Sequence, residues 1–269
     1  METNLTVIIP VHSLDEKEKD LFSNAIKSVE EQKVSVEKLI IVVPKGSEAK
    51  KTLDEFDFSD ETKNMLTIVE NDGETDFCSQ INFGAEKVET EWFSILELDD
   101  VYSNIWVDNF VKYKEENKDM DMFLPIVLDV NTENKFIHFS NEPVWARDFS
   151  EKMGQLDYDS LLNFPNFQIS GSVIKKESFD SVGGLKGNIK MFFGYEFLLR
   201  MSYYDMKMMT IPKIGYKKLN MRENSLFWRY KNDKDYFVDP VESKFWYNTS
   251  KKECYFKKGR GIKYETENV

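Results

Sequence analysis

Four short, predominantly apolar runs in the first hundred residues constrain the fold of this 269-residue chain more than any other feature. They span residues 5–11, 39–43, 65–69 and 92–98. Between them, apolar residues recur at helical spacing, as from Phe77 to Val88. Strands that are apolar on both faces are typical of parallel sheets, whose right-handed crossovers place helices on either side. We therefore predict an α/β fold with a single, mostly parallel Rossmann-like sheet flanked by helices.

The second half of the chain is less regular. Its patterns predict strands at 121–128, 167–175 and 208–214 and a helix at 195–204, with long loops over 129–166. Near the start, Ser13 and Glu16 have the spacing of a capping box for the first helix. No linker divides the chain, so we predict one domain over 1–225. The remaining residues, 226–269, are predicted to be a C-terminal extension that packs on the domain or is partly mobile.

Three carboxylates follow the fourth apolar run directly: Glu97, Asp99 and Asp100. Ligands bind to open α/β sheets at the carboxyl ends of the strands, where this cluster is expected. Oxygen ligands at this spacing suit a hard divalent cation that also binds phosphate oxygens. Two interpretations remain open: a nucleotide-phosphate site with Mn²⁺ or Mg²⁺, or an acidic turn exposed to water.

Composition narrows the classes of function. The net charge of −12 disfavours broad binding to nucleic acid or anionic lipid. The basic stretch at 251–263 has two interpretations, a patch that binds an anionic partner or a tail exposed to water. The sequence contains no apolar segment long enough to span a membrane and no recognisable signal peptide. Two distant cysteines favour a reducing, cytoplasmic setting, and two histidines exclude a multi-histidine metal site.

The order of these segments resembles the family-2-type glycosyltransferases, which have the glycosyltransferase A-type nucleotide-sugar-binding fold. The resemblance covers residues 5–226, and the matching segments are TVIIPV at 6–11, AIKSVEEQ at 25–32, NFG at 82–84, ELDD at 97–100, VGGL at 182–185 and RENSL at 222–226. The ELDD segment is similar to the family's aspartate-any-aspartate motif, with glutamate in place of the first acid. The resemblance implies sugar transfer from a nucleotide-diphospho-sugar donor to a carbohydrate or other hydroxyl acceptor, inverting and assisted by a divalent metal.

The resemblance also implies roles for the acids. Asp99 is the first candidate for metal contact, with Glu97 on the metal or the donor ribose and Asp100 orienting either group. The catalytic base is implied at the start of the helix that follows Gly183 and Gly184. Phe193 and Gly194 stand there instead of acids, so the nearest candidate for the base is Glu196. The alternative for Glu196 is an ion pair with Arg200, four residues later on the same helix.

The donor side departs from the family pattern. The resemblance places Pro10, Val11 and His12 at a nucleotide contact, with helix capping as the alternative for His12. Lys45 follows the second strand where the family has base-reading acids, and is expected to contact a phosphate or to point into water.

Three further candidates for donor contact lie later in the chain. Asp72 is expected to reach the nucleoside or to serve the Asn-Asp-Gly turn alone. Asn82 is expected to orient a ligand or to cap a neighbouring loop. Arg222 stands where the family often has a metal-binding histidine. Because arginine cannot ligate a metal, the hypothesis for Arg222 is a diphosphate clamp that supplements or partly replaces the cation, with a structural arginine as the alternative.

Two other functions compete with sugar transfer. A nucleotidyltransferase on a similar fold carries a glycine-rich basic loop after the first strand, which the segment His12-Ser13-Leu14-Asp15 lacks. A catalytically inactive nucleotide- or glycan-binding module is favoured by the missing acids at Pro44, Phe193 and Gly194. Retention of the three carboxylates at 97–100 favours the enzyme.

Overall fold

The computed structural model describes residues 3–146, 149, 152–164, 166–220, 222–223 and 225–238. The strands are β1 (Leu5–Pro10), β2 (Lys38–Pro44), β3 (Leu66–Asn71), β4 (Trp92–Ile95), β5 (Val101–Tyr102), β6 (Met122–Val130), β7 (Phe136–Ser140), β8 (Gln155–Leu156), β9 (Val173–Lys175) and β10 (Met208–Leu219). The α-helices are α1 (Lys19–Glu30), α2 (Glu48–Asp54), α3 (Asp60–Met65), α4 (Phe77–Glu86), α5 (Trp106–Glu116), α6 (Tyr158–Asn163), α7 (Lys176–Ser181), α8 (Phe193–Tyr203) and α9 (Leu226–Asn232), and η1 (Glu142–Trp145) is a 3-10 helix.

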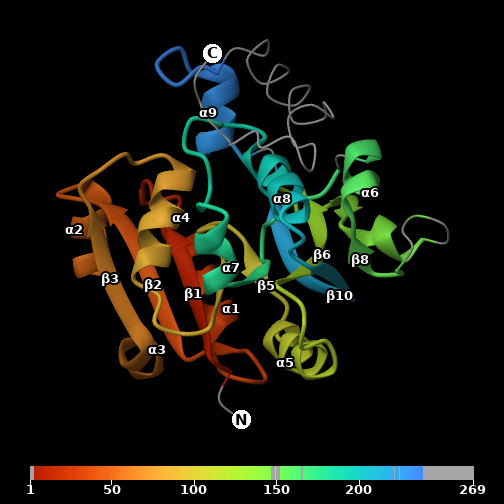
Figure 1. Ribbon diagram of the computed structural model, residues 1–269. Coiled ribbons are helices and arrows are strands. Elements are labelled where there is room, and N and C mark those ends of the chain that lie inside the picture. Colours follow the sequence, from red (N-terminus) through yellow and green to blue (C-terminus); the bar gives the residue numbers. More distant parts are fainter. Residues whose placement is uncertain are drawn as a thin grey trace.

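The strands form one mixed sheet in the order β3-β2-β1-β4-β9-β6-β10-β5, with β7 beside β6 and β8 beside β10. The first four strands of this order are parallel to one another, and β6 and β10 are also a parallel pair. Between the two groups lies β9, which is antiparallel to both β4 and β6. The prediction of an α/β fold with a mostly parallel sheet flanked by helices is confirmed (Figure 1).

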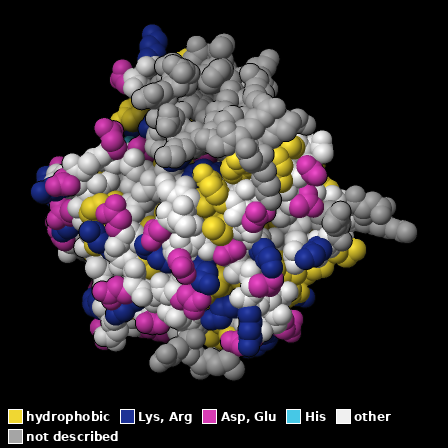
Figure 2. Space-filling model, viewed as in Figure 1, with side chains coloured by type: hydrophobic (Ala, Val, Ile, Leu, Met, Phe, Trp, Pro, Cys, Tyr) yellow, Lys and Arg dark blue, Asp and Glu magenta, His cyan; other side chains and the backbone are white. Residues whose placement is uncertain are grey.

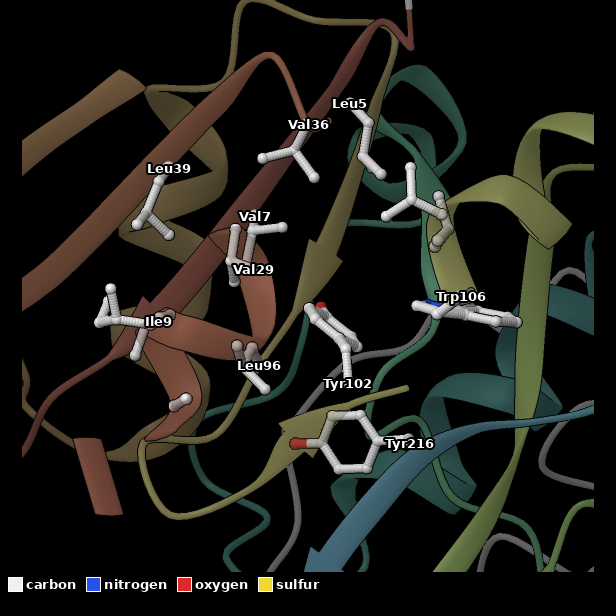
Figure 3. Packing of buried hydrophobic residues seen from close by; sticks show 14 of the residues in the cluster. Leu5, Val7, Ile9, Val29, Val36, Leu39, Leu96, Tyr102, Trp106 and Tyr216 are labelled. Atoms are coloured by element: carbon white, nitrogen blue, oxygen red, sulfur yellow. The ribbon is translucent and has the colours of Figure 1, made fainter. Parts of the chain in front are cut away.

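Both faces of the central strands are buried, as their continuous apolar sequences predict. Val7 and Ile9 of β1 face the layer that contains α1 and α5, whereas Ile8 faces the layer that contains α4, α7 and α8. Figure 3 shows the first of these cores, in which Val29 of α1 packs on β1. Each buried aliphatic side chain of this size stabilises the fold by about 1.5–3 kcal/mol. The two cores therefore fix the strands whose carboxyl ends form the candidate site.

Several local predictions are wrong, three of them near the candidate site. The fourth strand ends at Ile95 rather than at 98, because the chain turns so that the N–H of Asp100 bonds the carbonyl of Glu97 at 3.1 Å. The strand predicted at 167–175 begins only at Val173, since Gly171 adopts a left-handed φ of 73°. A Cβ atom on Gly171 would lie 2.4 Å from the ring of Tyr216, so a residue with a side chain does not fit there.

The third correction concerns the start of α1. The capping box of Ser13 and Glu16 does not form, because the helix begins at Lys19 and the Ser13 hydroxyl donates instead to Glu18, at 3.1 Å. The N–H of Asp15 donates to the same carboxylate at 3.0 Å. This arrangement buries Glu18 near the carboxyl end of β1, at 4% exposure.

The predicted division at 225 remains a prediction. The short helix α9 follows it and lies beyond the carboxyl ends of the strands in Figure 1. Most of the predicted C-terminal extension and all of the basic stretch at 251–263 lie outside the described residues. Among the helices of the described ranges, none combines the length and the apolar character required to span a bilayer. On the face drawn in Figure 2, the described lysine and arginine side chains are interspersed with acidic ones.

Candidate active site

Two adjoining cavities lie at the carboxyl ends of the strands. The first has a volume of about 180 Å³ and is lined by residues from β1, α4, the 97–99 turn, β10 and α9. The second has a volume of about 460 Å³ and is lined by β6, β7, the segment before β9 and the start of α8. Glu97, Lys218 and Asn220 line both cavities. This shared wall is where molecules bound in the two cavities would meet.

Glu97 is held at the shared wall by two hydrogen bonds. Its Oε1 atom accepts from the Nζ of Lys218 at 2.9 Å and from the Oγ of Ser170 at 2.7 Å. Burial lowers the pKa of Lys218, but the nearby carboxylates Glu97 and Asp100 more than offset this effect and raise the pKa above its ordinary value. Lys218 is therefore a permanent positive charge between the two cavities.

Asp99 forms a second ion pair in the first cavity. The Nε of Arg222 donates to Asp99 Oδ2 at 2.7 Å, and the Nη1 of the same arginine donates to Glu18 Oε1 at 2.9 Å. Burial is the largest cause of the raised pKa of Asp99, and the charge of Arg222 acts against it. Asp99 and Arg222 both line the cavity. The arginine thus lies beside the acidic turn, in the region where the sequence predicts a diphosphate contact.

Asp100 is different, because both of its oxygens accept bonds inside the protein. Oδ2 accepts from the Tyr216 hydroxyl at 2.8 Å, and Oδ1 accepts from the N–H of Leu219 at 2.7 Å. The Tyr216 hydroxyl in turn accepts from the N–H of Glu97 at 3.0 Å. Figure 3 shows the Tyr216 ring beside Tyr102 and Leu96. Asp100 is 2% exposed and does not line either of these two cavities, so its position supports the turn rather than contact with a ligand.

The acidic cluster fits a divalent cation. One carboxylate oxygen from each of Glu97, Asp99 and Asp100 lies within 4.8 Å of the others, a spacing at which hard cations share oxygen ligands. The bonds to Lys218 and Arg222 use one oxygen of Glu97 and one of Asp99, so each of these acids keeps a second oxygen for a metal. Glu97 and Asp99 are therefore the fitting ligands, while Asp100 is occupied by the backbone and by Tyr216.

Another part of the first cavity is lined by residues of β1, the loop before α4, and α4. Pro10 and His12 line it, whereas Val11 is fully buried and donates its N–H to the carbonyl of Val42. The Nδ1 atom of His12 lies 3.2 Å from the carbonyl of Thr75. Burial lowers the pKa of His12. The ring is therefore neutral at pH 7 and available for contact with an uncharged group.

Three residues predicted on the donor side do not line either of these cavities. Lys45 and Asp72 are exposed and form an ion pair with each other, with 3.6 Å between Nζ and Oδ2. Asn82 bonds both the N–H and the carbonyl of Leu185 at 2.8 Å, which fastens α4 to the turn before α8. The alternatives that the sequence left open, a solvated lysine and a structural asparagine, are the arrangements found here.

Glu196 is also placed away from both cavities. It is fully buried on α8 and accepts two bonds from Arg200, at 2.8 and 3.0 Å. The same guanidinium donates to the carbonyls of Val182 and Gly184. The structure thus contains the ion pair that the sequence offered as the alternative to a catalytic base, and this pair anchors the Gly183-Gly184 turn.

Several cavity residues were missed by sequence reasoning. Asp129, at the end of β6, is 2% exposed and accepts bonds from Ser140 at 3.1 Å and Gln168 at 3.2 Å. His138 faces it from β7, with 3.6 Å between Nε2 and Oδ2. All four residues line the second cavity. The available signal for Asp129 was its position at the end of an apolar strand. The partner strand β7, which carries His138 and Ser140, was predicted as loop, so nothing in the sequence indicated that these side chains would meet Asp129.

Comparison with known proteins identifies the family. The family described as "Glycosyl transferase family 2" matches residues 6–183, about two thirds of the chain. This chain belongs to glycosyl transferase family 2. The match includes the acidic turn and ends at the Gly183-Gly184 turn, so it covers the residues that carried most of the resemblance. A search of curated proteins finds no match.

Solved structures agree with this family-2 assignment at the level of the fold. S. aureus TarS 1–349 in complex with UDP-GlcNAc is similar with a TM-score of 0.61 and 11% identity over 82% of this chain and 59% of that one. GalNAc-T7 with UDP, GalNAc and Mn²⁺ is similar with a TM-score of 0.59 and 11% identity over 80% of this chain and 43% of that one. The family-2 chain thus spans less than two thirds of the length of these structures.

Proposed function

We propose that this chain transfers a sugar from a nucleotide-diphospho-sugar to an acceptor hydroxyl, with inversion at the sugar carbon. The observation that carries the proposal is the convergence of Glu97, Asp99, Lys218 and Arg222 on one cavity at the carboxyl ends of the strands. UDP-sugars are the first donors to test, because TarS is similar in fold and has been solved with UDP-GlcNAc. Cytoplasmic placement remains a prediction from the cysteine content.

The diphosphate of the donor is proposed to lie between Arg222 and Lys218. Arginine offers parallel N–H donors to phosphate oxygens, and lysine adds a positive charge at the shared wall. A divalent cation, held by Glu97 and Asp99 and proposed to be Mn²⁺ or Mg²⁺, would neutralise the charge that develops on the leaving diphosphate. The Mn²⁺ present in the GalNAc-T7 structure supports the choice of metal. Arg222 then supplements the cation rather than replacing it.

The acceptor is proposed to enter the second cavity. Its polar side chains include Asp129, His138, Ser140 and Gln168, together with Asn220 of the shared wall. An imidazole beside a buried carboxylate is suited to take a proton from a hydroxyl group. His138 is therefore the candidate base, with Asp129 positioning its ring from 3.6 Å. Entry of donor and acceptor from separate cavities is consistent with a single inverting displacement.

The experiment is a titration with UDP by calorimetry, in Mn²⁺ and in EDTA, followed by assay of UDP release from UDP-GlcNAc. In the wild-type chain, Mn²⁺ is expected to strengthen UDP binding. In Asp99→Asn that strengthening is expected to disappear, because the amide keeps the shape of the acid but loses its charge, and the fold is expected to be retained because Arg222 keeps its bond to Glu18. Asp72→Asn is the matched control, since Asp72 is exposed outside both cavities. A wild-type chain that binds no nucleoside diphosphate in either buffer would refute the proposal.

The second candidate function is a nucleotide- or glycan-binding module without catalysis. It is favoured by one observation, the burial of Glu196 in an ion pair at the place where the resemblance implied a base. Tight UDP binding without release of UDP from UDP-GlcNAc, with acceptor sugars present, would favour this module over the transferase.

A further inference from the structure

Gln80, on α4, is a buried polar side chain without a partner. It is 1% exposed, and neither its Oε1 nor its Nε2 atom forms a hydrogen bond within the described part of the chain. Buried amides are almost always hydrogen-bonded, because removal from water without a replacement partner is costly. Leucine at this position would fill similar space without that cost. The unpaired carboxamide therefore calls for a partner that the protein alone does not supply.

Gln80 is also one of the residues that line the first cavity. Gln80 lies one helical turn before Gly84, where an added Cβ would come within 2.8 Å of Ile8 and Val42. That turn of α4 is therefore pressed against β1 and β2. Pro10 lies two residues after Ile8 on the same face of β1 and lines the cavity too. The close approach at Gly84 thus brings Gln80 to the floor of the cavity beside Pro10.

This part of the cavity is lined mostly by uncharged side chains. Pro10, His12, Thr75 and Phe77 are uncharged at pH 7, since burial lowers the pKa of His12, and the charge of the nearby Glu18 is paired with Arg222. The cations Lys218 and Arg222 come from β10 and the segment after it, and Lys231 comes from α9. A ligand that spans the cavity would therefore have an anionic part near the cations and a flat, uncharged, hydrogen-bonding part near Gln80. A nucleoside diphosphate has both parts.

We propose that the Gln80 carboxamide reads the nucleobase of the donor, an inference that rests on the proposed function. A carboxamide presents one donor beside one acceptor, which matches the edge of a base that presents an acceptor beside a donor. In uracil these groups are O4 and N3–H. Asp72, which was expected to reach the nucleoside, pairs with Lys45 outside the cavity and does not line it.

The test separates base reading from phosphate binding. Gln80→Leu and the wild-type chain are titrated with UDP and with inorganic pyrophosphate. Loss of two hydrogen bonds is expected to weaken UDP binding by about 30-fold, or about 2 kcal/mol, and to leave pyrophosphate affinity unchanged. The melting temperature of Gln80→Leu is expected to rise, since two unsatisfied buried atoms are removed. Arg222→Gln is the matched control, and it should weaken both ligands.

A second probe needs no variant. UDP methylated at N3 of uracil lacks the N3–H donor, and it is expected to bind the wild-type chain about tenfold more weakly than UDP. Equal affinity for the two nucleotides, or a Gln80→Leu variant that binds UDP as tightly as the wild type, would overturn the inference. A parallel loss of UDP and pyrophosphate binding in Gln80→Leu would overturn it as well. A wild-type chain that binds neither ligand contradicts the proposed function itself.

Discussion

The buried pair of Glu196 and Arg200 gives a prediction that separates a structural role from a catalytic one. Both side chains are 1% exposed, and Arg200 donates to both oxygens of Glu196 and to the carbonyls of Val182 and Gly184. Arg200→Met removes all four of these bonds and leaves a buried carboxylate and two carbonyls without them. Breaking one partner of a buried pair costs about 3–5 kcal/mol, and each orphaned buried group adds about 1–3 kcal/mol.

These costs are not additive, so we expect Arg200→Met to lower the free energy of unfolding by about 5 kcal/mol. For a domain of this size, that loss corresponds to a fall in melting temperature of about 10–20 °C. Glu196→Gln keeps an acceptor for the guanidinium but loses the charge, and we expect it to cost about 3 kcal/mol. The double variant Glu196→Leu/Arg200→Met removes both charges together, so it should recover part of the stability lost in Arg200→Met.

Thermal unfolding by circular dichroism measures these differences, and UDP calorimetry on the same samples reports the site. The expected pattern is a large fall in melting temperature with UDP affinity retained below the transition. The reasoning is refuted if Glu196→Gln melts with the wild type while sugar transfer falls by about 100-fold, which is the behaviour of a general base.

Three further predictions follow from the site. Tyr216→Phe removes the hydroxyl that bonds Asp100 and the N–H of Glu97, so the free energy of unfolding measured by chemical denaturation should fall by about 2 kcal/mol. His138→Gln should slow UDP release from UDP-GlcNAc by about 100-fold with UDP affinity unchanged, whereas Glu133→Gln on the same hairpin should change neither. The pKa of His12 is lowered in the folded state by burial, so the unfolded state binds more protons and stability falls as the pH drops through 6.5. Urea unfolding at pH 7.5 and 5.5 should therefore show a smaller pH dependence in His12→Gln, and an equal dependence would contradict this assignment.

The N-terminal half of the fold was predictable because its signals are local. Strands buried on both faces have continuous apolar sequences, and β1, β2 and β3 were predicted to within one or two residues at either end. The acidic turn at 97–100 was also evident, since carboxylates rarely follow a buried strand without a role.

The arrangement around the acids was not predictable, because it depends on contacts between distant segments. Lys218 and Glu97 are 121 positions apart, and nothing in the local sequence of β10 marks its lysine as a partner for the turn. Glu18 was missed because Ser13 and Glu16 have the spacing of a capping box, which predicts that the helix begins just after Ser13. In the structure α1 begins at Lys19, and Ser13 donates to Glu18 instead. Glu196 was offered as a base by proximity along the helix, whereas its burial could be learned only from the packing of α8 on the sheet.

The dependence of the acidic turn on β10 has a consequence for synthesis of the chain. Asp100 and its partner Leu219 are 119 positions apart, so a ribosome that adds about 5–20 residues per second needs about 6–24 s to pass from one to the other. Throughout that interval the nascent polypeptide carries the carboxylates without the lysine and tyrosine that β10 brings. We therefore expect the amino-terminal strands to emerge and collapse first, with nucleotide affinity acquired only when translation has passed β10.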